Sequence, residues 1–210
     1  MRLMPALVAY AAGAQSHCGV RCQQHAEENN SKIFERVYRR RVWGGDGKTS
    51  SLSGKGSSLK ASQRLCALLG NVTAAAAVEN LAAGHSRVSF LDAPMGDLFW
   101  MSRCLPRIVK RLPASVRLDF YGVDVAATAV NLANQRRAQL AAKIGDGADI
   151  SAFELVDLAA ADDKFVRRHS TDGFDVVMCN DAPTLGLEPR TSSLVWLAAG
   201  SRAGLLLACF

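Results

Sequence analysis

An acidic turn is the part of this 210-residue chain whose residue types most clearly indicate chemistry. Within the segment from Ser89 to Trp100, the sequence Leu-Asp-Ala-Pro-Met-Gly-Asp places Asp92 and Asp97 on either side of Gly96. A ligand can approach the backbone closely at the glycine, which has no side chain to block it. Two carboxylates repel phosphate and attract a cation. The turn therefore favours a positively charged ligand over a dinucleotide, which needs several glycines and free amides at a helix N-terminus.

Two further acids stand where a nucleoside would need them. Asp124 ends an apolar segment, where its carboxylate can accept hydrogen bonds from ribose hydroxyls. The alternative for Asp124 is a helix cap, since a helical segment follows it, and one aspartate can serve both needs. Asp157, followed by Leu158, ends the next apolar segment and can accept from an adenine amino group. S-adenosylmethionine fits this pattern of charge because it carries a sulfonium and an ammonium group and no phosphate.

The elements that would position these acids alternate between strands and helices. A strand over 87–91 precedes the acidic turn, and Asp97 can cap the following helix, which Pro106 is expected to kink or interrupt. The alternation implies right-handed crossovers and an α/β, Rossmann-like, doubly wound and mostly parallel sheet with helices on both faces. The other predicted strands span 116–123, 150–156, 174–179 and 204–209, and the other predicted helices run from 57 or 58 to 69 and over 71–83, 125–143, 162–168 and 191–199.

Three parts of the chain differ in composition. Residues 1–30 read as a leader or a flexible tail, because they contain basic and small apolar residues and no acid before Glu27. Residues 31–84 contain N-terminal helices and a segment rich in glycine and serine. Residues 85–210 form the predicted nucleoside-binding domain.

The N-terminal part allows alternatives at two places. A helix over 31–41 has one apolar face, which we expect to dock on the main domain. Its basic side, with Arg39 and Arg40, is either a solvated face, the more frequent meaning of such a charge run, or an RNA contact. Residues 44–58 are either a linker or a lid that folds over a ligand.

Composition limits the partners and the compartment. With 49% hydrophobic residues the chain can bury a substantial core, and its formal charge of +6 favours anionic partners without the density of a nucleic-acid-binding arm. Six cysteines form no CxxC pair, so we expect reduced cysteines in an intracellular protein, which would be mitochondrial if residues 1–30 are a targeting leader. No spacing matches a known metal site. No segment approaches the roughly 20 apolar residues of a membrane span, so none is expected.

The sequence resembles the class I S-adenosylmethionine-dependent methyltransferases, and within them a group of small members. That group has a Trp-Gly and a Ser-Gly-x-Gly-Ser-Ser segment before the first strand, and a turn reading Leu-Asp-Ala-Pro-Cys-Gly-Asp followed by Trp-Met. The resemblance covers about residues 33–182. The matching residues are Trp43-Gly44, Ser53 to Ser58, Leu91 to Asp97 and Trp100-Met101, with similar segments at Gly122 to Asp124 and Phe153 to Leu158.

This resemblance implies where S-adenosyl-L-methionine would lie. The turn would surround its methionine end, Asp124 would bind the ribose, and Asp157 with Leu158 would bind the adenine. It also implies that residues 43–58 close over the cofactor, which favours the lid over the linker. The implied cofactor-binding residues are Trp43, Ser57, Ser58, Asp92, Ala93, Pro94, Met95, Gly96, Asp97, Trp100, Asp124, Val125, Asp157 and Leu158.

Three departures from the family pattern concern the turn, the chemistry and the sheet. Met95 replaces a cysteine, which is a tolerable change in an apolar contact. Leu185 stands where the family tends to have a histidine, so Asp181 becomes the candidate base and Asn180 its hydrogen-bonding orienter. A helix cap is an equally good interpretation of Asp181. A full class I domain has seven strands, whereas we expect this chain to lack the last two and to present an open sheet edge.

The expected function is methyl transfer to an unidentified acceptor, in which the enzyme holds the acceptor near the methyl carbon and excludes water. The alternative is a catalytically degenerate methyltransferase fold that acts as a structural or RNA- or protein-binding subunit of a larger assembly. In that case an RNA or protein partner could cover the open sheet edge.

Overall fold

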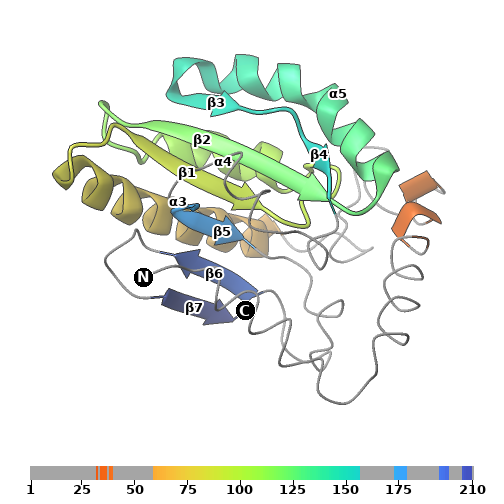
Figure 1. Cartoon of the computed structure of the whole chain (residues 1–210), viewed down its shortest axis with the longest axis horizontal. Helices are drawn as coiled ribbons and strands as arrows, with labels where there is room; N and C mark the ends of the chain where they lie inside the picture. The colour runs from red at the N-terminus through yellow and green to blue at the C-terminus, as the bar shows by residue number, and fades with distance from the viewer. Residues whose placement is uncertain are drawn as a thin grey trace.

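The computed structural model describes residues 32, 34–36, 38–39, 59–156, 173–178, 194–198 and 205–209, with the backbone alone at 59–62, 194–198 and 205–209. These residues form an α/β fold (Figure 1). The helices are α3 (Leu59–Ala82), α4 (Met101–Val109), α5 (Ala127–Ile144) and the short 3-10 turn η2 (Gly145–Gly147). The strands are β1 (Arg87–Asp92), β2 (Arg117–Asp124), β3 (Ala148–Ile150), β4 (Glu154–Leu155), β5 (Val176–Met178), β6 (Leu194–Ala198) and β7 (Leu205–Cys209).

The sheet is mostly parallel and Rossmann-like, as predicted. Its strand order is β3-β2-β1-β5-β6-β7, and β4 pairs with β2 beyond β3. The strands β3, β2, β1 and β5 run parallel, while β6 pairs antiparallel with both β5 and β7. Asp92 lies opposite Gly122 in the register of β1 and β2, so Asp92 and Asp124 leave the sheet at the same edge. This edge, at the carboxyl ends of parallel strands, is where open α/β sheets bind ligands.

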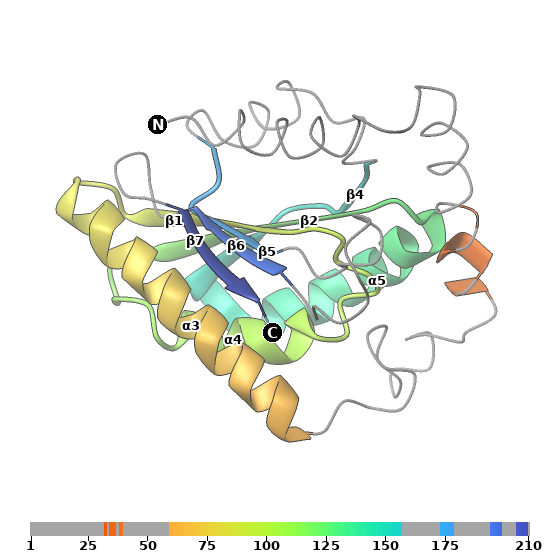
Figure 2. The ribbon, with the colours of Figure 1, turned by 90° about the horizontal axis from the view of Figure 1, so that it is seen from below.

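The described helices α3, α4 and α5 all pack on one face of the sheet (Figure 2). That face is apolar because successive strand residues point to opposite sides, and the residues at even positions are large and hydrophobic. Phe90 and Phe120, for example, are fully buried and lie opposite each other in β1 and β2. The other face carries a smaller cluster around Leu91 and Val123. The helix predicted at 162–168 lies outside the described residues.

The prediction of two helices before β1 was wrong, because α3 continues through Gly70 as one helix. Four consecutive alanines follow, and alanine has the highest helix propensity. The Arg111 side chain passes beside Gly70, with its Nη1 2.6 Å from where a Cβ would stand, and donates to the Ala67 carbonyl. The helix ends as predicted near Gly84, whose φ of 87° suits a residue without a side chain.

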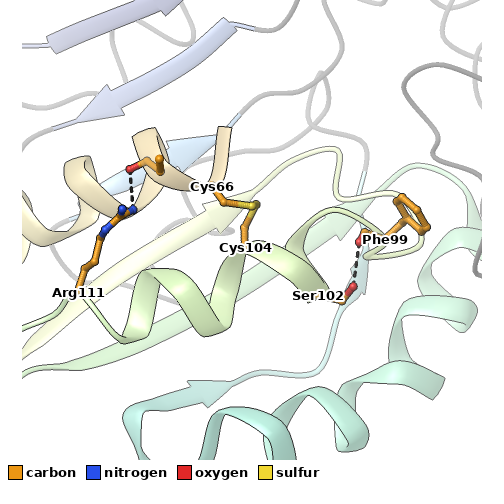
Figure 3. Close-up of a disulfide and its surroundings, with 6 residues drawn as sticks. Cys66, Phe99, Ser102, Cys104 and Arg111 are labelled. Atoms are coloured by element: carbon orange, nitrogen blue, oxygen red, sulfur yellow. Dashed lines mark hydrogen bonds between the residues drawn. A yellow bond between two sulfur atoms is a disulfide. The ribbon is translucent and has the colours of Figure 1, made fainter. Parts of the chain in front are cut away.

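A disulfide joins α3 to α4, contrary to the prediction of reduced cysteines (Figure 3). Cys66 and Cys104 are both fully buried where the two helices pack together. The cysteine spacing did not predict this pair, because the two residues are 38 positions apart and the whole of β1 and the acidic turn lies between them.

Three element boundaries also differ from the predictions. The predicted helix over 191–199 is the strand β6, which pairs antiparallel with β5 and β7, so an antiparallel pair ends the sheet where only one strand, over 204–209, was expected. The predicted strand over 150–156 is divided between β3 and β4. Helix α4 begins only at Met101, without a side-chain cap, and continues past Pro106 to Val109. Burial of Cys104, Leu105 and Ile108 keeps α4 helical although proline removes one helix hydrogen bond.

By length and composition alone, one segment of the described chain could cross a membrane, namely Gln63–Ala82 in α3. The prediction that no segment approaches this limit was therefore wrong. A core helix of a globular domain passes the same test. One side of α3 packs on the sheet and on α4, with Cys66, Leu69 and Ala77 fully buried.

Candidate functional site

The acidic turn after β1 is attached to both strands that flank β1 in the sheet. The Ala93 amide donates to the Met178 carbonyl of β5 at 2.9 Å, and the Met95 amide donates to the Val123 carbonyl of β2 at 2.9 Å. The peptide between Ala93 and Pro94 is cis. Gly96 has a φ of 60°, a left-handed conformation that glycine adopts without a steric penalty. The turn is therefore an ordered part of the sheet edge.

Asp124 binds this turn directly. Its Oδ2 accepts a hydrogen bond from the Gly96 amide and its Oδ1 one from the Ala126 amide, both at 2.8 Å. The carboxylate is 4% exposed. Ala126, and not Asp124, is the N-cap residue of α5, and no side chain caps this helix, so the helix-cap interpretation of Asp124 was wrong. A carboxylate has about four acceptor positions, so these two bonds do not exclude a ribose hydroxyl.

Asp92 is the least satisfied polar group among the residues that the structure describes. Its side chain is 1% exposed, and its Oδ1 has no hydrogen-bond partner among them. Burial raises the pKa of the Asp92 carboxyl well above its ordinary value, and the Asp124 carboxylate raises it further. Leaving a buried acceptor unpaired costs about 1–3 kcal/mol. A donor or cation bound at this edge would remove that penalty.

Asp97 behaves differently from Asp92 although both flank Gly96. Its carboxylate is 1% exposed and pairs with Arg136 of α5, with 2.8 Å between Oδ2 and Nη1. Its Oδ1 accepts from the Phe99 amide at 3.2 Å, so it caps the turn and not the helix that was predicted to begin there. Because Arg136 balances its charge, Asp97 adds less to the negative field than the sequence suggested.

Apolar side chains pack between the acidic turn and β2. Met95 is 6% exposed and packs with Phe153 over Gly122, where a Cβ would lie 2.5 Å from the Met95 Sδ. The side chain of Asn134 holds Phe153 by accepting from its amide and donating to its carbonyl, both at 3.1 Å. A glycine at position 122 is thus required by close packing against the turn.

The remaining predicted cofactor residues divide into two groups. Trp100 is 5% exposed immediately before α4, and the partly buried Val125 follows Asp124, so both lie beside the turn and Asp124. The positions of the others are outside the described residues, and their roles stay predictions. These are Trp43, Ser57, Ser58, Asp157 and Leu158. The predicted catalytic residues Asn180 and Asp181 also lie outside the described residues.

The N-terminal helical residues dock on α5, as predicted. Glu35 accepts from the Thr128 amide at 3.0 Å and from its hydroxyl at 2.5 Å, and Tyr38 is buried against Ala126 and Ala129. Burial tends to raise the pKa of Glu35, but the bonds from Thr128 and Arg39 lower it below its ordinary value. Arg39 pairs with Glu35 at 2.7 Å, and the choice between a solvated face and an RNA contact stays a prediction.

Three positioning residues escaped the sequence interpretation, namely Glu35, Asn134 and Arg136. Each is an ordinary polar residue on a helix, and each contacts a segment at least 19 residues away. For Glu35, the apolar face of residues 31–41 predicted that this helix docks on the main domain, but it did not identify Glu35 as the residue that makes the polar contact. The sequence contained no comparable signal for Asn134 and Arg136.

No family model and no curated protein matches this chain. Among solved structures, the fold is similar to that of an inferred class I S-adenosylmethionine-dependent methyltransferase from Listeria monocytogenes, with a TM-score of 0.35 and 13% sequence identity. The match covers 85% of this chain and 47% of that protein, so the chain spans about half of its length.

Proposed function

We propose that this chain binds S-adenosylmethionine at the carboxyl ends of β1 and β2 and transfers its methyl group to an acceptor. The observation that carries the proposal is the buried Asp92 carboxyl, with an unpartnered oxygen, beside a second buried carboxylate, Asp124. Buried polar atoms without partners are rare in folded proteins and often mark functional positions. Here the missing partner is a hydrogen-bond donor, and a cationic one is best suited to the charge.

Electrostatics distinguishes between the possible nucleoside ligands. A unit charge about 4 Å from another contributes roughly 4 kcal/mol at the effective dielectric constant of such sites. A phosphate beside the Asp124 carboxylate would be opposed by an interaction of this size. An ammonium or sulfonium group would be favoured, and it would also favour the ionised form of Asp92, whose pKa is raised in the unliganded protein. Gly96 does not offer its amide to a phosphate either, because Asp124 accepts from it.

The residues of the turn supply the environment for the methionine end of the cofactor. S-adenosylmethionine, when bound, supplies an electrophilic methyl group on a positively charged sulfur. Asp92 would accept from the cationic end, Asp124 from the ribose, and Asp157 with Leu158 would hold the adenine. The turn itself is almost entirely buried, which limits water at the reacting end. Holding the acceptor in line and excluding water are the main contributions an enzyme makes to such a transfer.

The residues that would act on the methyl acceptor lie outside the described part of the structure, and their roles are proposed from the sequence. Asp181 follows β5 in the sequence and is our candidate base, with Asn180 as its orienter. The methyl acceptor is unidentified. In the alternative function, a subunit that binds RNA or protein without catalysis, the strand at the sheet edge would be covered by the partner, and methyl transfer would be absent.

A ligand panel tests the proposal by thermal unfolding of the full chain. S-adenosylmethionine at about 100 times its Kd should stabilise the folded protein by about 2.7 kcal/mol, which raises Tm by about 5–10 °C for a domain of this size. Adenosine diphosphate has the same nucleoside and phosphates in place of the cation, so it should produce no shift. Equal shifts with both ligands would contradict the electrostatic argument.

A further inference from the structure

Arg136 connects helix α5 to the acidic turn by two hydrogen bonds. Its Nη1 donates to the Asp97 carboxylate at 2.8 Å and to the Asp97 backbone carbonyl at 2.6 Å. The arginine side chain is 25% exposed and that of Asp97 is 1% exposed, so the pair lies mostly out of water. A single side chain thus fixes both the charge and the backbone of Asp97.

The backbone on either side of Asp97 needs such support. Gly96 has a φ of 60° and Leu98 a φ of 67°. For a leucine this left-handed conformation is unfavourable and persists only where the surroundings impose it. The Leu98 side chain is fully buried, and the Arg136 contact to the Asp97 carbonyl lies between the two left-handed residues.

Two elements that follow β1 in the chain therefore hold consecutive residues of the turn. Asp124, at the end of β2, accepts from the Gly96 amide, and Arg136, in α5, holds Asp97. From the same helix, Asn134 exchanges two hydrogen bonds with Phe153, in the connection between β3 and β4. Helix α5 thus fixes both the acidic turn, through Arg136, and the connection between β3 and β4, through Asn134.

We propose that Arg136 is a positioning residue of the candidate site, which holds the turn in the conformation that presents Asp92 and Gly96 to the ligand. It acts through Asp97 and does not itself contact the ligand. Its charge also balances that of Asp97, so that Asp92 is left as the unpartnered acid of the turn. The inference rests on the proposed function, because the ligand in question is an S-adenosyl compound.

The test must separate positioning from stability, since an Arg136→Met variant leaves the buried Asp97 carboxylate without its counter-ion. The double variant Asp97→Asn with Arg136→Met removes that buried charge and still lacks the anchor. Arg117→Met is the matched control, because Arg117 pairs with Asp149 at 2.8 Å and lies at the start of β2, at the opposite end of the sheet.

Two measurements are made on each full-length variant. Hydrogen exchange, followed by mass spectrometry, reports the protection of the amides of residues 93–100, including those of Gly96 and Phe99. Calorimetry with S-adenosylhomocysteine reports the affinity. We expect Arg136→Met and the double variant to exchange faster in this segment and to bind about tenfold more weakly. The double variant should recover thermal stability but neither the amide protection of residues 93–100 nor the affinity for S-adenosylhomocysteine. Arg117→Met should retain both the protection and the affinity.

The outcomes distinguish the two proposals. Unchanged exchange of residues 93–100 in the double variant, or a loosened turn with unchanged affinity, would overturn the role of Arg136. If the unmodified chain does not bind S-adenosylhomocysteine or S-adenosylmethionine, the proposed function is wrong, and faster exchange of this segment would still establish that Arg136 holds the turn. Should Arg136→Met fail to fold, the double variant alone decides.

Discussion

Asp92 and Asp124 end neighbouring parallel strands, and the Asp124 carboxylate contributes to the raised pKa of the buried Asp92 carboxyl. Asp124 is bound by two backbone amides, whereas one oxygen of Asp92 has no partner in the described part of the chain. The two acids therefore have different tasks. Asp124 organises the turn, and Asp92 is the group that a ligand would satisfy.

Replacing Asp92 with asparagine should change how stability depends on pH. The pKa of Asp92 in the folded protein lies above its unfolded value, so the unliganded protein loses stability as pH rises through the range between them. The loss is about 1.4 kcal/mol for each unit of difference, and Asp92→Asn does not titrate. Urea unfolding at several pH values should therefore show that the free energy of unfolding of Asp92→Asn increases relative to that of the parent chain as pH rises. Asp146→Asn, on the exposed turn η2, is the control. Parallel profiles for parent and Asp92→Asn would contradict the assignment.

Glu35→Gln should loosen the N-terminal helical residues from α5. The variant loses a charged acceptor at a helix N-terminus, which contributes about 0.5–2 kcal/mol. Because the pKa of Glu35 is lowered on folding, its contribution is present above its unfolded pKa and is lost as pH falls through its folded pKa. The difference in unfolding free energy between parent and variant should therefore disappear in acid. Glu79→Gln, on the exposed side of α3, is the matched control. If Glu79→Gln and Glu35→Gln lower the unfolding free energy equally, the Glu35–Thr128 contact does not anchor the N-terminal helical residues.

Gly122→Ala should disturb the packing beneath the turn. Its Cβ would meet the Met95 Sδ at 2.5 Å and the Phe153 ring at 2.9 Å. Overpacking of this kind destabilises by about 1–3 kcal/mol. Combining it with Met95→Ala should recover part of the loss, so the two changes should be less than additive in urea unfolding. Strict additivity would show that Met95 and Gly122 do not share the space described.

The Cys66–Cys104 disulfide should be recovered as a linked peptide from unreduced protein. Replacing both cysteines with alanine should lower the unfolding free energy by about 2–4 kcal/mol, and a reductant should then have no further effect at this site. If alkylation of the unfolded, unreduced chain labels both thiols, the bond does not form in the protein as isolated.

Much of the fold could be predicted because the relevant signals are local. The strands around 87–91 and 116–123 and the helix around 125–143 follow from short apolar runs and from glycine at their ends. By contrast, the apolar run Leu194–Ala198 suits either a helix or a strand, and its pairing with β5 decides the outcome. Gly70 suggested a helix end, but the alanine-rich segment after it continues α3 as one helix.

Charge balance at the site was harder to predict than its location. The turn and Asp124 were identified from sequence because each follows a strand. Which of Asp92 and Asp97 is neutralised depends on Arg136, which is 39 residues beyond Asp97 and has no fixed spacing to it. For the same reason the contact of Glu35 with Thr128, 93 residues apart, could not be predicted.

Calorimetric titration of the full chain with S-adenosylmethionine near neutral pH measures directly whether the folded protein binds this ligand. We expect saturable binding with a micromolar Kd, and a loss of at least about tenfold, or 1.4 kcal/mol, in Asp124→Ala. The Arg117→Met variant should bind like the parent chain. Heats that equal those of dilution for the folded parent chain would contradict the claim.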